Sequence, residues 1–428
     1  MSNPSQIAAV DGGAGGNGFP MGPYDGGANG IFAVLFNAAI PDIEIWKSLD
    51  GGQTWAQQNS ANNPAPIVSI CGSCFDSVNG IIYVAYVGSD TNLNFKPFNV
   101  STSTWGAQVN GGPGPLNTGF AVNIRVCLRS TGPLVFLCGL EGPGPSNISQ
   151  CVEYKAGAWG AAIQVASNAG TNKDYPVDIC PGSAGLVHVF TNDSAFTTGA
   201  LRHVSLNTVN ALSVFTVIAN NIQDSSDGPT ASINVQSFYD SVGGTLYVPG
   251  YDSNTSVMHI FSAPESAVPN PWTDNNMDSA YQNPLSGRVL AMSALVVGVL
   301  QSYRTFESGG SQVGPWSIVG NGSGNAGGYI SPGTLFSISL GIVTGKPAIV
   351  FTEDPSGPAS FAATRTMFFI GSGGGGGGGT FILNAILPAQ ACGSVLLPFM
   401  VDCCNVCDMQ EPMILGKAII YARNEFTD

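Results

Sequence analysis

Residues 67–105 contain the pattern that decides the fold: the runs IVSIC at 67–71, IIYVAY at 81–86 and NFKPFNV at 94–100, followed by Trp105. Gly, Pro, Asn, Asp and Ser separate these runs, as expected of consecutive short β-strands. The second run is almost entirely apolar, which is typical of a strand buried on both faces. The segment therefore predicts a small antiparallel sheet of three or four strands.

The same pattern recurs along the chain at 122–159, 177–206, 232–272, 289–316 and 335–370, with an incomplete copy at 31–55. A repeat of about 50 residues built from short strands is typical of a β-propeller. We therefore expect an all-β fold, a β-propeller of seven blades with six as the alternative, each blade being a short antiparallel four-stranded sheet. Because the first copy lacks an opening strand, we expect ring closure to combine strands from both ends of the chain.

The composition excludes several classes of partner. The chain has 13 basic and 27 acidic residues, a net charge of −14 and no cluster of Lys and Arg. Binding to nucleic acid or to an anionic membrane surface is therefore not expected. The longest apolar stretch, 289–300, is too short to span a bilayer. Residues 1–4 (MSNP) do not begin a secretory signal, so we expect synthesis in a cytoplasm.

The sequence divides into four predicted parts. A glycine-rich N-terminal arm is expected at 1–28, the propeller at 29–372, a linker of consecutive glycines at 373–379 and an extension at 380–428. Consecutive glycines supply a flexible connection. The extension has several apolar runs but is too short to bury them well alone. We therefore expect it to anchor the protein to a neighbouring subunit or partner.

Residues 48–55 read SLDGGQTW. This segment resembles the Asp-box of the sialidase-like β-propellers, Ser-x-Asp-x-Gly-x-Thr-Trp, and matches it completely. The resemblance implies a turn between the third and fourth strands of a blade, in which side-chain oxygens bind backbone amides and the indole plugs the space between blades. The roles implied are structural, and they fall on Ser48, Asp50, Gly52, Thr54 and Trp55.

The resemblance also suggests a test for catalysis. Sialidases use three arginines, a Tyr–Glu pair and an acid–base Asp, with an Arg-Ile-Pro segment before the first Asp-box. No arginine precedes Ser48, and nothing signals a triad of Arg125, Arg202 and Arg304. The carboxylates that could pair for glycoside hydrolysis have no recognisable context: Asp174, Asp178, Asp224, Asp227, Asp252 and Glu353. We assign no catalytic residue and expect a non-enzyme, with a sialidase-like hydrolase as the alternative.

Cysteines and histidines are the candidate metal ligands. Cys404 and Cys407 have the spacing of a zinc knuckle, so zinc held with Cys392 and Cys403 is one interpretation, and adjacent thiols or disulfides are the other. No other cofactor is expected. The remaining six cysteines are expected to be buried free thiols. The three histidines are expected to be hydrogen-bonded between different blades, with a three-histidine metal site as the alternative: His188, His203 and His259.

Low charge, abundant Gly, Asn, Ser and Thr, and two tails form a profile similar to that of phage and virion structural proteins. We therefore expect a virion protein, made in a host cytoplasm, that serves as a capsid decoration, neck or tail appendage. Its expected partners are other virion subunits, copies of itself and a host-surface glycan. The alternatives are a carbohydrate-binding or glycoside-cleaving sialidase-like surface protein and an extracellular fibre-forming protein. The side chains of the axial pocket should distinguish an enzyme from a binding protein.

Overall fold

The computed structural model has two compact units, and the larger one comprises Pro4–Ile370. The structure describes residues 5–9, 21–37, 40–67, 71–114, 124–141, 147–165, 175–192, 198–223, 234–252, 257–267, 272–274, 287–297, 299–308, 314–315, 318–320, 325–326, 330–331, 334–354, 365–370, 380–386, 396–402, 413–415 and 418–420. In these ranges nearly all regular structure is β-strand, with four 3-10 turns: η1 (Gly27–Asn29), η2 (Ser60–Asn62), η3 (Ser183–Gly185) and η4 (Glu265–Ala267).

The first three blades are separate antiparallel sheets. Blade 1 contains β2 (Met21–Asp25), β3 (Ile31–Asn37), β4 (Asp42–Ser48) and β5 (Ala56–Gln58). Blade 2 contains β6 (Cys71–Asp76), β7 (Ile81–Val87), β8 (Leu93–Asn99) and β9 (Thr104–Trp105). Blade 3 contains β10 (Arg125–Leu128), β11 (Leu134–Glu141), β12 (Asn147–Lys155), β13 (Ala158–Trp159) and β14 (Ile163–Gln164).

Blades 4 and 5 join into one eight-stranded sheet, so the ring has six or seven blades depending on how that sheet is counted. Blade 4 contains β15 (Tyr175–Pro181), β16 (Val187–Asn192), β17 (Thr198–Leu206) and β18 (Thr216–Gln223). Blade 5 contains β20 (Phe238–Asp240), β21 (Thr245–Asp252), β22 (Val257–Pro264) and β23 (Thr273–Asp274).

Blade 6 contains β19 (Asn234–Gln236), β24 (Gly287–Val297), β25 (Val299–Ser308), β27 (Ile318–Gly320) and β28 (Asn325–Ala326). Two further short strands, β26 (Gly314–Pro315) and β29 (Ile330–Ser331), pair with each other. The inner strand of blade 5 is thus interrupted, because β19 pairs in parallel with β24 while β20 pairs with β21. Ser237 lies at the interruption, which leaves its backbone outside both ladders.

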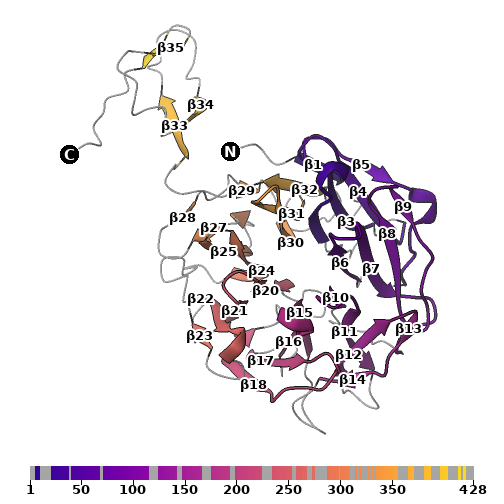
Figure 1. The fold of residues 1–428 in the computed structure, drawn as a ribbon. Helices are drawn as coiled ribbons and strands as arrows, with labels where there is room; N and C mark the ends of the chain where they lie inside the picture. The colour runs from indigo at the N-terminus through magenta and orange to yellow at the C-terminus, as the bar shows by residue number, and fades with distance from the viewer. Residues whose placement is uncertain are drawn as a thin grey trace. The chain divides into compact units, whose positions relative to one another are not determined.

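Strands from both ends of the larger unit close the ring. Blade 7 contains β30 (Thr334–Val343), β31 (Lys346–Asp354) and β32 (Arg365–Ile370), and β1 (Ser5–Ala9) pairs antiparallel with β32 (Figure 1). Closure from both ends agrees with the expectation, but the first repeat does not lack an opening strand: β2 supplies it, and β1 completes blade 7 instead. The predicted N-terminal arm at 1–28 is wrong in that it contains β1 and β2, both propeller strands. Most of its glycines lie at 10–20, outside the described residues.

Two other boundaries differ from the sequence-based prediction. The opening strand of blade 2 is β6 at Cys71–Asp76, so it extends five residues beyond the predicted run at 67–71, of which residues 68–70 lie outside the described residues. The two strands predicted within 289–300 are the long β24 and the start of β25, which pair directly on either side of residue 298. Apolar content marked these regions correctly as strand, but it did not mark their ends.

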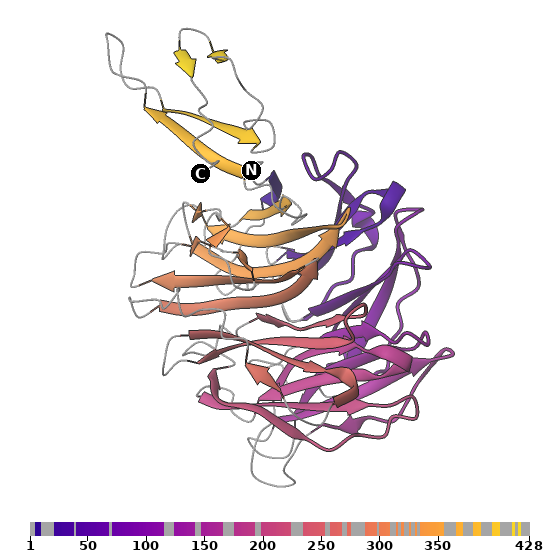
Figure 2. The same cartoon turned by 60° about the vertical axis from the view of Figure 1, so that its left-hand side comes forward.

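Hydrophobic contacts between blades form the core. Phe32 and Ile45 of blade 1 pack in one cluster with Ile82 and Phe98 of blade 2, and all four side chains are fully buried. Equivalent clusters join blades 2 and 3, 3 and 4, 4 and 5, and 7 and 1. Figure 2 shows the sheets of successive blades stacked on one another. Since burial of one such side chain stabilises the fold by about 1.5–3 kcal/mol, stacking holds the ring together.

Tryptophans occupy equivalent places at the seams between blades. Trp105 and Trp159 lie in the fourth strands of their blades, and Trp55 directly precedes the fourth strand of blade 1. The Trp55 ring lies 5.2 Å from the Phe368 ring of blade 7, and the Trp159 ring lies 5.6 Å from the Phe95 ring of blade 2. Each of these two indoles therefore contacts the preceding blade of the ring.

The smaller unit comprises Met1–Asn3 and Gly371–Asp428. Its described strands form two antiparallel pairs: β33 (Thr380–Ile386) with β34 (Leu396–Asp402), and β35 (Met413–Leu415) with β36 (Ala418–Ile420). The predicted linker at 373–379 and the candidate zinc ligands Cys392, Cys403, Cys404 and Cys407 lie outside the described residues. Within the described part of the chain, no helix has the length and apolar character needed to cross a membrane.

Candidate functional site: the axial cavity

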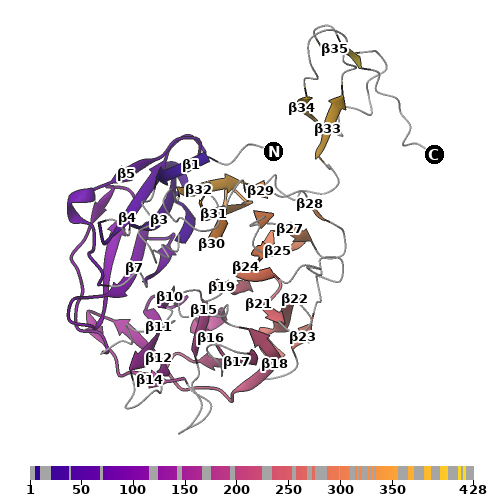
Figure 3. The ribbon, with the colours of Figure 1, turned by 180° about the vertical axis from the view of Figure 1, so that it is seen from behind.

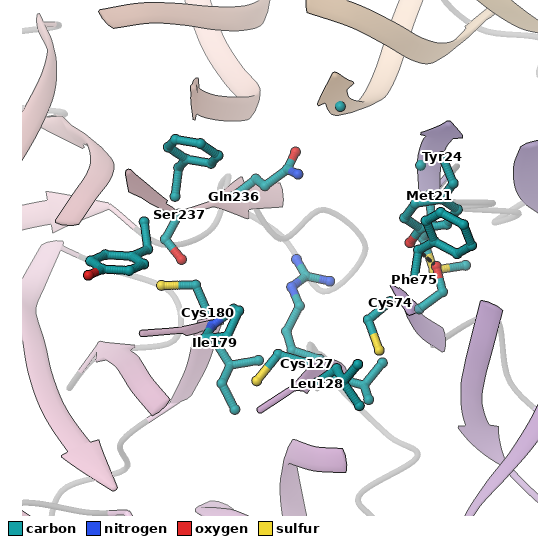
Figure 4. Close-up of a pocket in the computed structure, with 18 of the residues that line it drawn as sticks. Met21, Tyr24, Cys74, Phe75, Cys127, Leu128, Ile179, Cys180, Gln236 and Ser237 are labelled. Carbon is teal, nitrogen blue, oxygen red and sulfur yellow. Dashed lines mark hydrogen bonds between the residues drawn. The ribbon is translucent and has the colours of Figure 1, made fainter. Parts of the chain in front are cut away.

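A cavity of about 960 Å³ lies along the inner strands of the ring. Residues of β2, β6, β10, β15, β30 and the β19–β20 segment line it, and the labelled side chains of Figure 4 surround one common space. Figure 3 shows β10, β15, β19 and β30 towards the middle of the ring. The inner strands carry small residues because their backbones converge: a Cβ on Gly72 would overlap the backbone of Ile124 in the next blade.

Charged and polar groups of three blades meet in the cavity wall. Arg125 on β10 pairs with Asp178 on β15, with Nε and Oδ1 3.3 Å apart. Ser237, at the break between β19 and β20, donates from its backbone N–H and from Oγ to Asp178 Oδ2, the latter at 2.7 Å. Burial raises the pKa of Asp178, while Arg125 and Ser237 oppose this shift. The interruption of the blade 5 inner strand thus supplies the amide that holds this carboxylate.

A second carboxylate joins blades 4 and 5 beside the cavity. Glu265 begins η4, and its side chain is 8% exposed. Its Oε1 accepts from the Ser183 N–H at 2.9 Å and contacts His188 Nε2 at 2.8 Å. Its Oε2 accepts from Ser183 Oγ and from the Tyr239 hydroxyl, the latter at 3.0 Å. Ser183 and Tyr239 both line the cavity, so this buried carboxylate orients two hydroxyls of the cavity wall.

Two buried histidines continue this network away from the cavity. His188 Nδ1 lies 3.0 Å from His203 Nε2, and the His203 ring contacts Phe190 and Trp272. Burial lowers the pKa of His188 and lowers the pKa of His203 to about 3. Both imidazoles are therefore neutral at pH 7, so in the hydrogen bond between them one ring nitrogen donates and the other accepts.

The expected hydrogen bond between blades is present for His188, which contacts Glu265 of blade 5, but the partners of His203 and His259 lie in their own blades. His188 and His203 lie on adjacent strands of the same blade, not in different blades, and both are buried. His203 Nδ1 has no partner among the described residues. His259 is separate and contacts Asp274 through Nδ1 at 2.8 Å. The three histidines therefore do not converge on one point.

Thiols of three adjacent blades also line the cavity: Cys74, Cys127 and Cys180. Burial raises the pKa of each thiol, which keeps it protonated and poorly nucleophilic at neutral pH. Five of the six described cysteines are buried and Cys74 is half-buried. Among the described residues, no group of three or more His, Cys, Asp or Glu side chains has an arrangement that could hold a metal ion.

The other carboxylates that line the cavity are engaged in turns. Asp25 accepts from the backbone N–H groups of Gly27 at 2.9 Å and Thr344 at 2.7 Å. Asp76 accepts from the N–H groups of Val78 and Asn79, both at 3.0 Å. Both carboxylates lie in or beside turns that follow inner strands, where they fix the turn backbone.

The structure places the other sequence-derived candidates away from this cavity. Ser48, Asp50, Gly52, Thr54 and Trp55 form the connection between β4 and β5 and do not line the cavity. Arg202 lies on the third strand of blade 4, and Arg304 lies on β25, whose side chains are not described. Arg125 is the one arginine among the described lining residues. The described part of the cavity wall therefore contains no arginine triad.

Of the two candidate carboxylates whose side chains the structure describes, Asp178 lines the cavity and Asp252 does not. Asp174, Asp224 and Asp227 lie outside the described residues. The prediction missed Glu265, Ser183, Tyr239 and Ser237. No local pattern marks them, because Glu265 lies 82 residues from Ser183 and Ser237 lies 59 residues from Asp178.

No protein-family model matches the sequence, and no curated protein is significantly similar to it. Among solved structures, a lectin from Burkholderia pseudomallei is similar over 83% of this chain and 96% of its own, with 13% identity and a TM-score of 0.56. A fungal lectin from Aleuria aurantia matches 71% of this chain and 92% of its own at 12% identity and a TM-score of 0.46. The NanB sialidase of Streptococcus pneumoniae matches 86% and 71% at 11% identity and a TM-score of 0.44. At 13% identity the similarity to the Burkholderia pseudomallei lectin shows a shared fold alone, and the ring of antiparallel sheets described above is that fold, a β-propeller.

Proposed function

We propose that the protein is a non-enzymatic carbohydrate-binding propeller that holds its ligand in the axial cavity and belongs to a virion or similar assembly. The observation that carries the proposal is the chemistry of the cavity wall. It combines apolar and aromatic side chains with hydroxyl and amide groups, such as Tyr24, Phe75, Gln236 and Ser237 (Figure 4). A sugar needs this combination, because its ring presents C–H faces and hydroxyl edges.

The engaged carboxylates support binding rather than hydrolysis. Glycoside hydrolysis requires two carboxyl groups that face one substrate bond, one of them able to give a proton. Here Asp25 and Asp76 bind turn amides, and Asp178 is paired with Arg125 and Ser237. Each carboxylate among the described lining residues thus has a structural task. The protein from Burkholderia pseudomallei, a lectin by its description, adds support by analogy of fold.

A glycan array probed with the intact protein tests the proposal. Ser241→Trp places a large side chain at an exposed serine that lines the cavity, so we expect it to abolish glycan binding. Ser101→Trp is the matched control, because Ser101 is an exposed turn residue outside the cavity lining. Equal binding by wild type and Ser241→Trp would place the ligand elsewhere, and release of reducing sugar would show an enzyme.

The assembly part of the proposal rests on the separate smaller unit. Residues 371–428 cluster apart from the propeller in their contacts, and their sequence contains several apolar runs. Truncation after Ser372 should leave a folded propeller, because its last strand, β32, ends at Ile370. We expect full-length protein to sediment as an oligomer and the truncated chain as a monomer. Unfolding of the truncated chain, or unchanged oligomerisation, would refute an anchoring role.

A further inference from the structure

Three hydroxyl groups lie on the part of the cavity wall that blades 4 and 5 form, and all three give their protons to carboxylates. Ser183 and Tyr239 donate to Glu265, and Ser237 donates to Asp178. Each of the three residues lines the cavity. A hydroxyl has one proton and two acceptor lone pairs. A hydroxyl whose proton points into the wall can therefore offer only acceptor lone pairs to a ligand.

The direction of these hydrogen bonds follows from the state of Glu265. Burial alone would raise its pKa, but hydrogen bonds from Ser183, His188 and Tyr239 together lower that pKa below its ordinary value. Glu265 is therefore ionised at neutral pH, and an ionised carboxylate only accepts. Ser183 and Tyr239 must consequently be the donors.

The histidines behind Glu265 fix the same direction. Neutral His188 must carry its proton on Nε2 to donate to Glu265, so its Nδ1 accepts from His203 Nε2. Both imidazole protons of this series of hydrogen bonds point towards Glu265, so neither is donated to Ser183 or Tyr239. The backbone also closes tightly on the network, because a Cβ on Gly182 would overlap both Glu265 and His188.

At Asp178 the argument is independent of Glu265. The Ser237 backbone N–H can only donate, and it shares Asp178 Oδ2 with the Ser237 hydroxyl. Arg125 pairs with the other oxygen of the same carboxylate. The charges of Arg125, Asp178 and Glu265 leave this wall with a net negative charge, which disfavours an anionic ligand.

We propose that this acceptor wall, formed by Ser183, Ser237 and Tyr239, makes the cavity specific for neutral sugars whose hydroxyl groups donate hydrogen bonds, and selects against sugars that carry carboxylate, sulfate or phosphate. The inference rests on the proposed function and specifies its ligand class. The ligand hydroxyls that face this wall must be free to donate. A methyl ether at the same position retains the oxygen but cannot donate, so it should not bind.

The experiment is an array that carries neutral oligosaccharides, their O-methylated counterparts, and sialylated and sulfated glycans. Wild type should bind the neutral glycans and should not bind their O-methylated counterparts. Tyr239→Phe removes one acceptor and should weaken neutral-glycan binding about 5-fold. Tyr247→Phe is the matched control, because Tyr247 on the next strand does not line the cavity.

Glu265→Gln tests directly whether the wall hydroxyls only accept hydrogen bonds from the ligand. The amide nitrogen of Gln donates, so one of the two hydroxyls must accept from it and can turn its own proton to the ligand. We expect this variant to gain binding to acidic glycans. If it does not fold, Tyr239→Phe and O-methylation still decide the question. This inference alone would be overturned if wild type bound O-methylated or acidic glycans as well as neutral ones while Ser241→Trp still abolished binding. Binding to no glycan would overturn the proposed function and this inference together.

Discussion

Asp50 and Glu265 each accept four hydrogen bonds, yet the two carboxylates have different structural roles. Asp50 accepts from Ser48 Oγ, the Gln53 N–H, and the N–H and Oγ1 of Thr54, all within four residues along the chain. The partners of Glu265 lie 26 to 82 residues away and belong to blades 4 and 5. The first cluster shapes one exposed turn, whereas the second joins two blades and orients cavity hydroxyls.

The comparison shows that the structural role of a hydrogen-bonded carboxylate in this fold depends on how far along the sequence its donors lie, not on how many donors it has. A local cluster costs little chain entropy to form and can be satisfied by water when it opens. A buried cluster that joins distant segments leaves its donors unpaired when it is broken. The predictions below test this difference, from the largest expected effect to the smallest.

Glu265→Ala should have the largest effect on stability. The substitution leaves His188 Nε2 and the Ser183 N–H without their acceptor at a buried seam. We expect the free energy of unfolding to fall by roughly 3 kcal/mol. Urea unfolding of wild type and variant measures it. Glu265 would not be the group that joins blades 4 and 5 if the two midpoints coincided.

Gly182→Ala should disrupt the same cluster without removing any of its groups. The added Cβ would overlap Glu265 and His188, so the seam must shift to admit it. We expect a loss of about 1–3 kcal/mol, as for overpacking elsewhere. Gly160→Ala is the control, because the nearest atom to its Cβ would be Glu153 O at 3.3 Å. Equal stability of the two variants would show that the seam has room to relax.

These two substitutions address residues that no sequence pattern marks. The propeller itself was predictable, because strands, turns and tryptophans recur with a period that blade stacking requires. Two turns of similar sequence also have similar structure: 76–80 (DSVNG) and 240–244 (DSVGG) differ at one position, and in both the Asp accepts from the N–H two residues later. The cavity wall was not predictable, because the packing of blade 5 on blade 4 brings Glu265 to Ser183 and no local sequence pattern marks that contact.

Acidification should weaken the blade 4–5 seam before it affects the turn at Asp50. Burial holds the pKa of His188 and of His203 below the ordinary value, so the unfolded chain binds more protons than the folded one below about pH 6.5. Stability should therefore be complete above that pH and fall as the pH drops, by up to about 1.4 kcal/mol per pH unit for each histidine.

Unfolding measured at pH 7, 6 and 5 tests this sign. His203→Gln keeps a donor for His188 Nδ1 but removes one titrating group, so its stability should depend less steeply on pH. The slope is the relevant quantity, because the substitution also changes packing against Phe190 and Trp272. An unchanged slope in the variant would assign the acid sensitivity to other groups.

Asp50→Asn should have the smallest effect. Hydrogen bonds from the Thr54 side chain, the Thr54 backbone and Ser48 hold the pKa of Asp50 well below its ordinary value. The charged form therefore stabilises the fold above about pH 3.9, and this contribution is lost as the pH falls below that value. Because Asp50 is exposed, solvent screens the interaction and water can replace the lost acceptor. We expect a small decrease in melting temperature at pH 7 that shrinks at pH 3, with glycan binding unchanged. A decrease as large as that of Glu265→Ala would mean that the turn, through Trp55 and its contact with Phe368, also holds blades 1 and 7 together.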